Sequence, residues 1–125
     1  MNRRTFMATS SLVALVVAGL ALLWPSGLLA SKGVELGAAV QVWVREVGVL
    51  IFAFGVTTFQ ARKSTDPVAL RAVLLGSAVL HFCLLPIELV AYWEGVITKV
   101  SGVVPNSVLH VALGAASLHF ARFRA

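Results

Sequence analysis

The ionisable side chains within otherwise apolar stretches include five that fall in one half of the membrane or at its middle, Arg45, Glu46, His81, Glu88 and His110, while His119 stands apart near the cytoplasmic end. An ionisable group inside a membrane helix is costly, so it indicates either a functional site or a polar contact that joins helices. Imidazole and carboxylate groups together can exchange protons, form hydrogen bonds or contact a quinone. We therefore treat these five residues as a candidate polar pocket.

The spacing of these residues indicates how they could meet. His81 and Glu88 are seven residues apart, which places both on one face of a helix. Arg45 and Glu46 are adjacent and would point about 100° apart on a helix. We expect Glu46 to face inward and Arg45 to reach outward or across to Glu88. An ion pair that only fastens two helices together is the alternative to a pocket that binds or moves something.

The histidines His81 and His110 allow three interpretations. They could form interhelical hydrogen bonds, or they could be the axial ligands of a b-type haem, since they fall at similar depth on consecutive segments. They could also work with Glu88 as a proton relay or a quinone contact. Pro86 lies between His81 and Glu88 and would free a backbone carbonyl, which favours a cavity nearby.

The elements that must position these residues are apolar helices. The chain has 125 residues, of which 59% are hydrophobic and 12% charged. A membrane-spanning helix needs about 20 apolar residues. The sequence therefore predicts an all-α bundle of four transmembrane helices that forms a single domain over residues 1–125. The expected helices cover residues 6–29, 42–61, 68–93 and 105–120.

Small residues within these segments predict close helix packing. Gly48 and Gly55 are seven residues apart on the second segment, and Ala72 and Gly76 are four apart on the third. Small side chains let helix backbones approach closely in lipid. The pattern favours a tight bundle but leaves open whether the contacts lie within one copy or between copies.

The basic residues and the tryptophans predict the same topology. Trp24, Trp43 and Trp93 fall at segment ends on one side, as an aromatic belt does at a membrane interface. An excess of basic residues falls on the other side, which the positive-inside rule assigns to the cytoplasm. That side would hold Arg3, Arg4, Arg62, Lys63, Arg71, Arg122 and Arg124, against Lys32, Arg45 and Lys99 opposite. We therefore predict cytoplasmic termini in the plasma (inner) membrane of a bacterium. The net charge of +5 follows from this topology, so no nucleic-acid partner is predicted.

The first segment has a second interpretation. Arg3 and Arg4 before an apolar run resemble a twin-arginine export signal, and Ala30 could serve as a cleavage site. Pro25 would kink or break the helix near its far end.

The sequence lacks the motifs of common enzymes. Cys83 is the single cysteine, so no intrachain disulfide, paired-cysteine motif or cysteine-based zinc site can form. We find no phosphate-binding glycine loop and no recognisable nucleophile with its base. We predict no catalytic residue and no metal site, and we do not expect this chain to be an enzyme on its own.

From residue 45 to about residue 120, the chain resembles the small four-helix integral membrane proteins grouped as DoxX-like. The resemblance is carried by Arg45-Glu46-Val47-Gly48, Asp66-Pro67-Val68-Ala69-Leu70-Arg71, Gly76, His81, Glu88 and His110. It implies a membrane subunit that works beside a redox enzyme, including thiosulfate or quinone chemistry. No catalytic residue set transfers, and the lack of a second cysteine departs from dithiol chemistry.

These observations lead to three hypotheses. The first is an accessory subunit whose outward-facing polar pocket serves a redox enzyme partner or a quinone within the lipid bilayer. The second is an electron carrier that binds haem b through His81 and His110. The third is a small transporter or channel that works as a homo-oligomer, because four helices enclose little volume.

Overall fold

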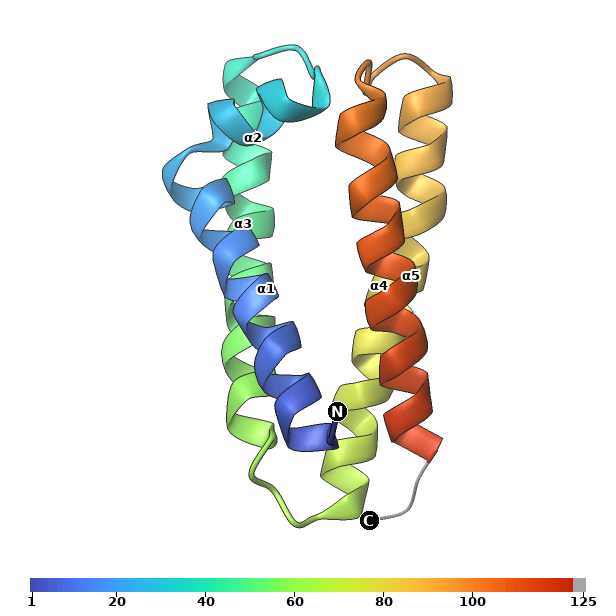
Figure 1. Cartoon of the computed structure of the whole chain (residues 1–125). Helices are drawn as coiled ribbons and strands as arrows, with labels where there is room; N and C mark the ends of the chain where they lie inside the picture. Colours follow the sequence, from blue (N-terminus) through green and yellow to red (C-terminus); the bar gives the residue numbers. More distant parts are fainter. Residues whose placement is uncertain (123–125) are drawn as a thin grey trace.

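The computed structural model describes residues 1–122 of the chain, and these residues form five α-helices with no strand among them (Figure 1). The helices are α1 (Arg3–Leu23), α2 (Pro25–Lys32), α3 (Ala38–Ala61), α4 (Pro67–Trp93) and α5 (Val100–Arg122). α1, α3, α4 and α5 are long and apolar enough to cross a membrane, whereas α2 is a short helix of 8 residues at one end. The predicted all-α bundle with four membrane-crossing helices is confirmed.

The helix bounds differ from the prediction chiefly in the first and the last segment, and α3 begins at Ala38 rather than at residue 42. The first expected segment is divided at Trp24, whose φ of −141° and ψ of 56° leave the helical conformation. Pro25 then starts α2, where its missing N–H costs nothing. The last helix begins at Val100, ahead of the expected start at Pro105, because the helix continues through this proline at the cost of one backbone hydrogen bond.

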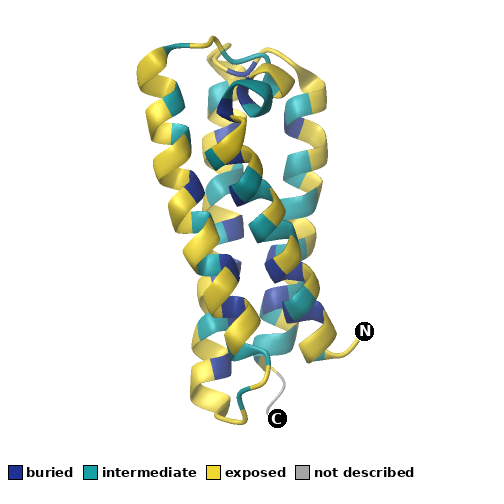
Figure 2. Ribbon diagram, turned by 90° about the vertical axis from the view of Figure 1, so that its left-hand side faces the viewer, coloured by how far each residue is buried: buried dark blue, intermediate teal, exposed yellow. Residues whose placement is uncertain are grey.

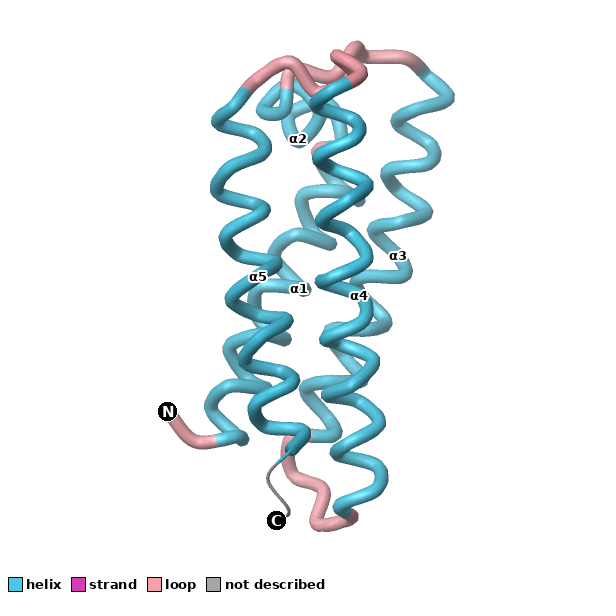
Figure 3. Tube along the Cα trace, turned by 90° about the vertical axis from the view of Figure 1, so that its right-hand side faces the viewer, coloured by secondary structure: helices cyan, strands magenta, loops and turns pink. Residues whose placement is uncertain are grey.

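The four long helices are arranged as two pairs. α1 packs along α3, and α4 packs along α5, while fewer contacts join the two pairs. Figure 1 shows α1 and α3 on one side and α4 and α5 on the other, and Figure 3 shows the connecting loops at the two ends of the bundle. The first turn of α1 and the last turn of α5 lie at the same end of the molecule, because Arg3 and Arg122 border one cavity.

Two glycines allow α1 and α3 to pack closely. A Cβ atom added to Gly55 would lie 3.1 Å from Leu15, and one added to Gly48 would lie 3.0 Å from Ala21. The Ser11 hydroxyl also donates a 2.6 Å hydrogen bond to the carbonyl of Gly55. These contacts lie within one copy of the chain. Gly76, in contrast, has nothing within 4 Å of an added Cβ atom.

A small apolar core holds the two pairs together at the end that carries the termini. Phe6 and Met7 of α1 form a buried cluster with Leu70 and Leu74 of α4. The ring of Phe6 also stacks on Phe120 of α5, with 5.1 Å between the ring centroids. Figure 2 shows that much of the outward surface is exposed. Exposed apolar side chains such as Leu50, Val68 and Ile87 suit a surface that contacts lipid.

Aromatic and basic residues mark opposite ends of the bundle. Trp24, Trp43 and Trp93 are exposed at the end where α2 lies. The basic residues that were expected to be cytoplasmic lie at the other end as far as the described residues extend; Arg124 lies outside them. The segregation is the one that a membrane-spanning bundle requires. The side of the membrane that each end faces stays a prediction.

Candidate functional site

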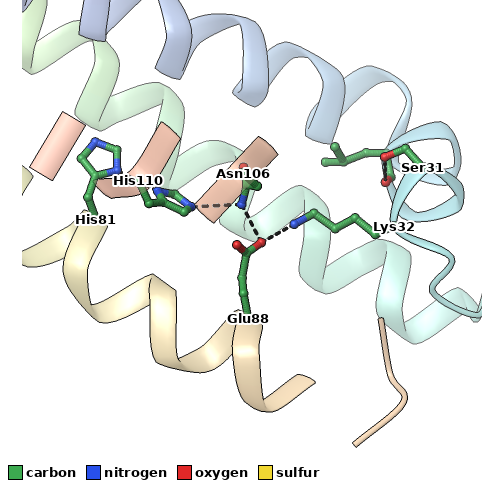
Figure 4. Close-up of polar contacts among 7 residues, drawn as sticks. Ser31, Lys32, His81, Glu88, Asn106 and His110 are labelled. Atoms are coloured by element: carbon green, nitrogen blue, oxygen red, sulfur yellow. Dashed lines mark hydrogen bonds and ion pairs between the residues drawn. The ribbon is translucent and has the colours of Figure 1, made fainter. Parts of the chain in front are cut away.

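Five polar side chains from three helices form a continuous row, which we call the polar row: Lys32, Glu88, Asn106, His110 and His81 (Figure 4). Lys32 Nζ forms an ion pair with Glu88 Oε1. Asn106 Nδ2 lies 2.5 Å from the same oxygen and 3.1 Å from His110 Nε2. His110 Nδ1 lies 2.9 Å from His81 Nδ1. Each member therefore contacts the next.

Helical spacing explains how α4 and α5 build this row. His81 and Glu88 are seven residues apart on α4, and Asn106 and His110 are four apart on α5, so each pair shares one helix face. At about 1.5 Å per residue, Glu88 lies roughly 7 Å from the end of α4, and His81 lies about 18 Å from it. The row therefore runs from near one end of the bundle towards the middle of the membrane.

Lys32 reaches the row because α2 is fixed to the start of α5. The backbone carbonyl of Lys32 accepts hydrogen bonds from the N–H groups of Thr98 and Lys99, each at 3.2 Å. The Thr98 hydroxyl donates a 2.8 Å hydrogen bond to the carbonyl of Gly33. Gly102 provides the necessary space, because an added Cβ atom would lie only 2.6 Å from Lys32 Cα. α2 therefore acts as a bracket that places the ammonium group beside Glu88.

Glu88 is the most constrained acid in the described part of the chain. It is 8% exposed, and its Oε1 atom receives both the Lys32 ammonium and the Asn106 amide. Its Oε2 atom is shielded from solvent and has no hydrogen-bond partner among residues 1–122. A carboxylate can accept several hydrogen bonds, so the Oε2 atom of Glu88 could accept a further one.

The hydrogen bonds fix the tautomers of the two histidines. The Asn106 amide must turn Nδ2 towards Glu88, because the reverse orientation would place two acceptor oxygens together. Its second hydrogen then points to His110 Nε2, which accepts. His110 therefore carries its proton on Nδ1 and donates to His81 Nδ1, so His81 carries its own proton on Nε2.

His81 Nε2–H is the free end of the row. Among residues 1–122, His81 has one hydrogen-bond partner, His110, and that contact uses Nδ1. The N–H on the other side of the ring is therefore available to an acceptor, near the middle of the helix. A donor without a partner in an apolar environment is costly, so this position indicates a ligand or a facing protein group.

The two histidines do not have the geometry of haem ligands. A metal–imidazole bond is about 2 Å long, so two nitrogens on opposite sides of one metal ion lie roughly 4 Å apart. The Nδ1 atoms of His81 and His110 lie 2.9 Å apart, and their rings are in contact with a centroid distance of 5.1 Å. The Nδ1 atoms are therefore too close to hold one metal ion between them, and His110 Nε2, the other nitrogen that could bind iron, faces Asn106.

The structure brings together three of the five residues that the sequence singled out, namely His81, Glu88 and His110. Arg45 and Glu46 lie on exposed positions of α3, and neither forms a hydrogen bond or an ion pair with a residue in the described range. Glu46 is exposed rather than inward, and Arg45 takes the outward one of its two expected positions and makes no contact with Glu88. The reason is that α3 pairs with α1 and contacts α4 only slightly.

Two members of the polar row, Asn106 and Lys32, were missed by the sequence analysis. Asn106 could have been found, because it lies one helical turn before His110 on the same apolar segment. Lys32 gave no such signal. Its place beside Glu88 depends on the short α2 helix turning back over the end of the bundle, and the sequence was interpreted there as a loop.

When the sequence and the fold are compared with known proteins, no family model, no curated protein and no solved structure matches. The resemblance to DoxX-like proteins therefore stays a prediction. The site has to be interpreted from its own geometry.

Proposed function

We propose that this small integral membrane protein is an accessory subunit that serves a redox partner or a quinone through the polar row, with His81 Nε2–H as the contacting group. The observation that carries the proposal is that the His81 ring contacts His110 through Nδ1 and leaves Nε2 without a partner among residues 1–122. In the predicted orientation, the Lys32 end of the row lies at the outer side of the membrane.

The chemistry of a quinone suits this donor. A quinone carbonyl oxygen accepts a hydrogen bond, and negative charge develops on that oxygen when the redox partner supplies electrons. An N–H donor that is already oriented stabilises such charge without reorganisation. The imidazole is held by His110 on its other side, so its direction is set before the ligand arrives.

The other members of the row would orient His81 rather than conduct protons. Asn106 donates to Glu88 on one side and to His110 on the other, so it cannot pass a proton through its amide unless the amide turns. Lys32 and Glu88 hold that amide in place. The proposed role of the ion pair is therefore to fix the tautomers of the two histidines.

The sequence resemblance agrees with this role. The resemblance to DoxX-like proteins implies a subunit that works beside a redox enzyme. A free hydrogen-bond donor within the membrane is a group that a lipid-soluble electron carrier could contact. The haem alternative has less support, because the spacing of His81 and His110 does not suit axial ligation.

Infrared difference spectroscopy tests the proposal directly. The purified protein in detergent would be mixed with a short-chain quinone, and the carbonyl stretching band of the quinone would be recorded. We expect a shift to lower frequency with the wild type and no shift with His81→Phe. His119→Phe is the matched control, since His119 lies at an exposed position near the other end of α5. A band at the free-quinone position with wild-type protein would contradict the quinone contact.

The accessory role needs a separate experiment. A tagged copy would be purified from its native membranes in mild detergent, and the preparation examined for flavin or haem absorption and for the attached polypeptides. We expect an electron-transfer enzyme to be retained in stoichiometric amount. Recovery of the chain alone at full yield would contradict the accessory role and would leave the quinone contact to be judged by the infrared result.

A small oligomeric transporter or channel is the second candidate, and the unused Oε2 atom of Glu88 favours it. A buried carboxylate oxygen without a partner can receive a cation or a protonated substrate. This candidate predicts substrate flux in proteoliposomes that falls with Glu88→Gln. Equal flux in the variant would remove Glu88 from a transport mechanism.

A further inference from the structure

A cavity of about 710 Å³ lies at the end of the bundle opposite the Lys32 end of the polar row. It is bordered by the start of α1, the first turns of α4 and the end of α5. Its volume falls within the range of roughly 300–1,000 Å³ that small-molecule sites occupy. The cavity shares no residue with the polar row, so it calls for its own explanation.

Three arginines supply all the charge that residues 1–122 contribute to this cavity. Arg3, Arg71 and Arg122 contribute to its lining, and no acidic residue does. None of the three forms an ion pair with a carboxylate of residues 1–122. Three positive charges along one cavity, with no acidic residue in its described lining, favour an anion beside them.

Arg3 adds a second, independent observation. Its Nε atom is shielded from solvent and has no hydrogen-bond partner in the described part of the chain. A buried donor without an acceptor is costly, so an acceptor that reaches Arg3 would relieve this cost. The guanidinium group presents several N–H donors in a plane, and this geometry matches the oxygens of a phosphate group.

The remainder of the lining is apolar and continues into the membrane. Val68, Leu75 and Phe120 border the cavity. Val68 is 74% exposed and Leu75 is 38% exposed, and Val79 extends the same face of α4 towards the bilayer centre with 62% exposure. A free phosphate ion would leave this apolar wall uncovered. A ligand with a phosphate at one end and a hydrocarbon chain at the other would cover both parts.

We propose that the cavity between Arg3, Arg71 and Arg122 binds the phosphate headgroup of an anionic phospholipid, whose acyl chains lie along the exposed face of α4. Basic pockets between transmembrane helices are suited to such headgroups. The site lies at the end of the bundle where the basic residues gather, which is where the headgroups of one leaflet would be.

Native mass spectrometry of the full chain in a neutral detergent tests this proposal. The protein would be titrated with phosphatidylglycerol and with phosphatidylcholine of the same acyl chains, and the lipid-bound fraction measured for each. We expect preferential binding of phosphatidylglycerol. In the triple variant Arg3→Gln, Arg71→Gln, Arg122→Gln, that affinity should fall on the order of 100-fold, given the usual contribution of each basic residue near an anionic headgroup.

The matched control removes the same charge from the same end without touching the cavity. This control is the triple variant Arg4→Gln, Arg62→Gln, Lys63→Gln. It also loses three positive charges, and none of the three residues lines the cavity. We expect it to keep the preference. Equal loss in both variants, or no preference in the wild type, would overturn the proposal.

Two further measurements keep the result interpretable. If the triple variant fails to fold, Arg3→Gln alone should weaken phosphatidylglycerol binding about fivefold; unchanged binding would contradict the role of Arg3 in the cavity. Millimolar inorganic phosphate should not displace the lipid. Displacement would show that a bare anion is sufficient and would contradict the part of the proposal that concerns the acyl chains.

Discussion

His81 and His110 face each other across the α4–α5 interface with their Nδ1 atoms 2.9 Å apart. One hydrogen must lie between these atoms, and the Asn106 amide decides which ring supplies it, because it donates to His110 Nε2 at 3.1 Å. The tautomers of both histidines are therefore set by a neutral side chain one helical turn from His110.

The first prediction concerns these tautomers. Nitrogen-15 NMR of selectively labelled histidine should report a proton on Nδ1 of His110 and on Nε2 of His81. Asn106→Leu removes the donor to His110 Nε2, so the two rings should then exchange between tautomers and their resonances should broaden or move together. Identical nitrogen shifts in the wild type and in Asn106→Leu would contradict the assignment.

The second prediction concerns the ion pair of Lys32 and Glu88. Lys32→Met leaves a buried carboxylate without its cation, and breaking a buried pair in this way costs about 3–5 kcal/mol of unfolding free energy. Lys32→Met combined with Glu88→Leu should recover much of that loss, because an apolar pair needs no desolvation. Reversible unfolding in a denaturing detergent measures both quantities.

Arg45→Met is the control for this measurement. Arg45 is exposed and has no ion-pair partner within residues 1–122, so its replacement should change the free energy of unfolding by less than about 0.5 kcal/mol. A loss with Lys32→Met that is no larger than the loss with Arg45→Met would show that the ion pair does not stabilise the bundle.

The helices were predictable because membrane insertion depends on local composition. A run of about 20 apolar residues specifies a spanning helix wherever it occurs, and the four segments were found for that reason. The break at Trp24 was also visible in the sequence, since Pro25 follows it. The continuation of α5 ahead of Pro105 was not, because a single lost hydrogen bond does not end a helix that is otherwise favourable.

The site was predictable only where it follows from helical periodicity. His81 and Glu88 share a face by spacing alone, and the same rule would have joined Asn106 to His110. The contacts between residues of different helices could not be derived from the sequence. They depend on how each helix is rotated about its own axis and on which helices pack together. Arg45 was expected to reach outward or across to Glu88. It is exposed because α3 pairs with α1, and Lys32 takes the place beside Glu88 from a helix that the sequence did not reveal.

The third prediction concerns haem. The protein, expressed with added haem and purified in detergent, should give a flat reduced-minus-oxidised visible spectrum. The reason is that His81 and His110 are hydrogen-bonded to each other and do not leave the roughly 4 Å between nitrogens that axial ligation requires. Sharp α and β bands that disappear with His81→Ala would show that the helices separate to admit a haem.

The fourth prediction concerns the α1–α3 interface. Gly55→Ala should destabilise the bundle by about 1–3 kcal/mol, because the added methyl group would lie 3.1 Å from Leu15. Gly76→Ala provides the matched control, since nothing lies within 4 Å of its added Cβ atom. That variant should be neutral or should gain up to about 1 kcal/mol from the better helix propensity of alanine. Equal effects of the two substitutions on detergent unfolding would argue against close packing at Gly55.

The fifth prediction tests whether the α2 bracket places Lys32 beside Glu88. Gly33 and Gly95 both have positive φ, at 68° and 74°, so alanine should cost about 1–2 kcal/mol of backbone strain at either position. An added Cβ atom at Gly33 would also lie 2.2 Å from Thr98 Oγ1, whereas one at Gly95 would have nothing within 4 Å. Gly33→Ala should therefore loosen α2 from α5, and Gly95→Ala should not.

The measurement is the coupling energy between Lys32 and Glu88, obtained from a double-mutant cycle in each background. We expect this coupling to fall in the Gly33→Ala background and to keep its wild-type value in the Gly95→Ala background. Equal coupling in the two backgrounds would mean that Lys32 finds Glu88 without the bracket.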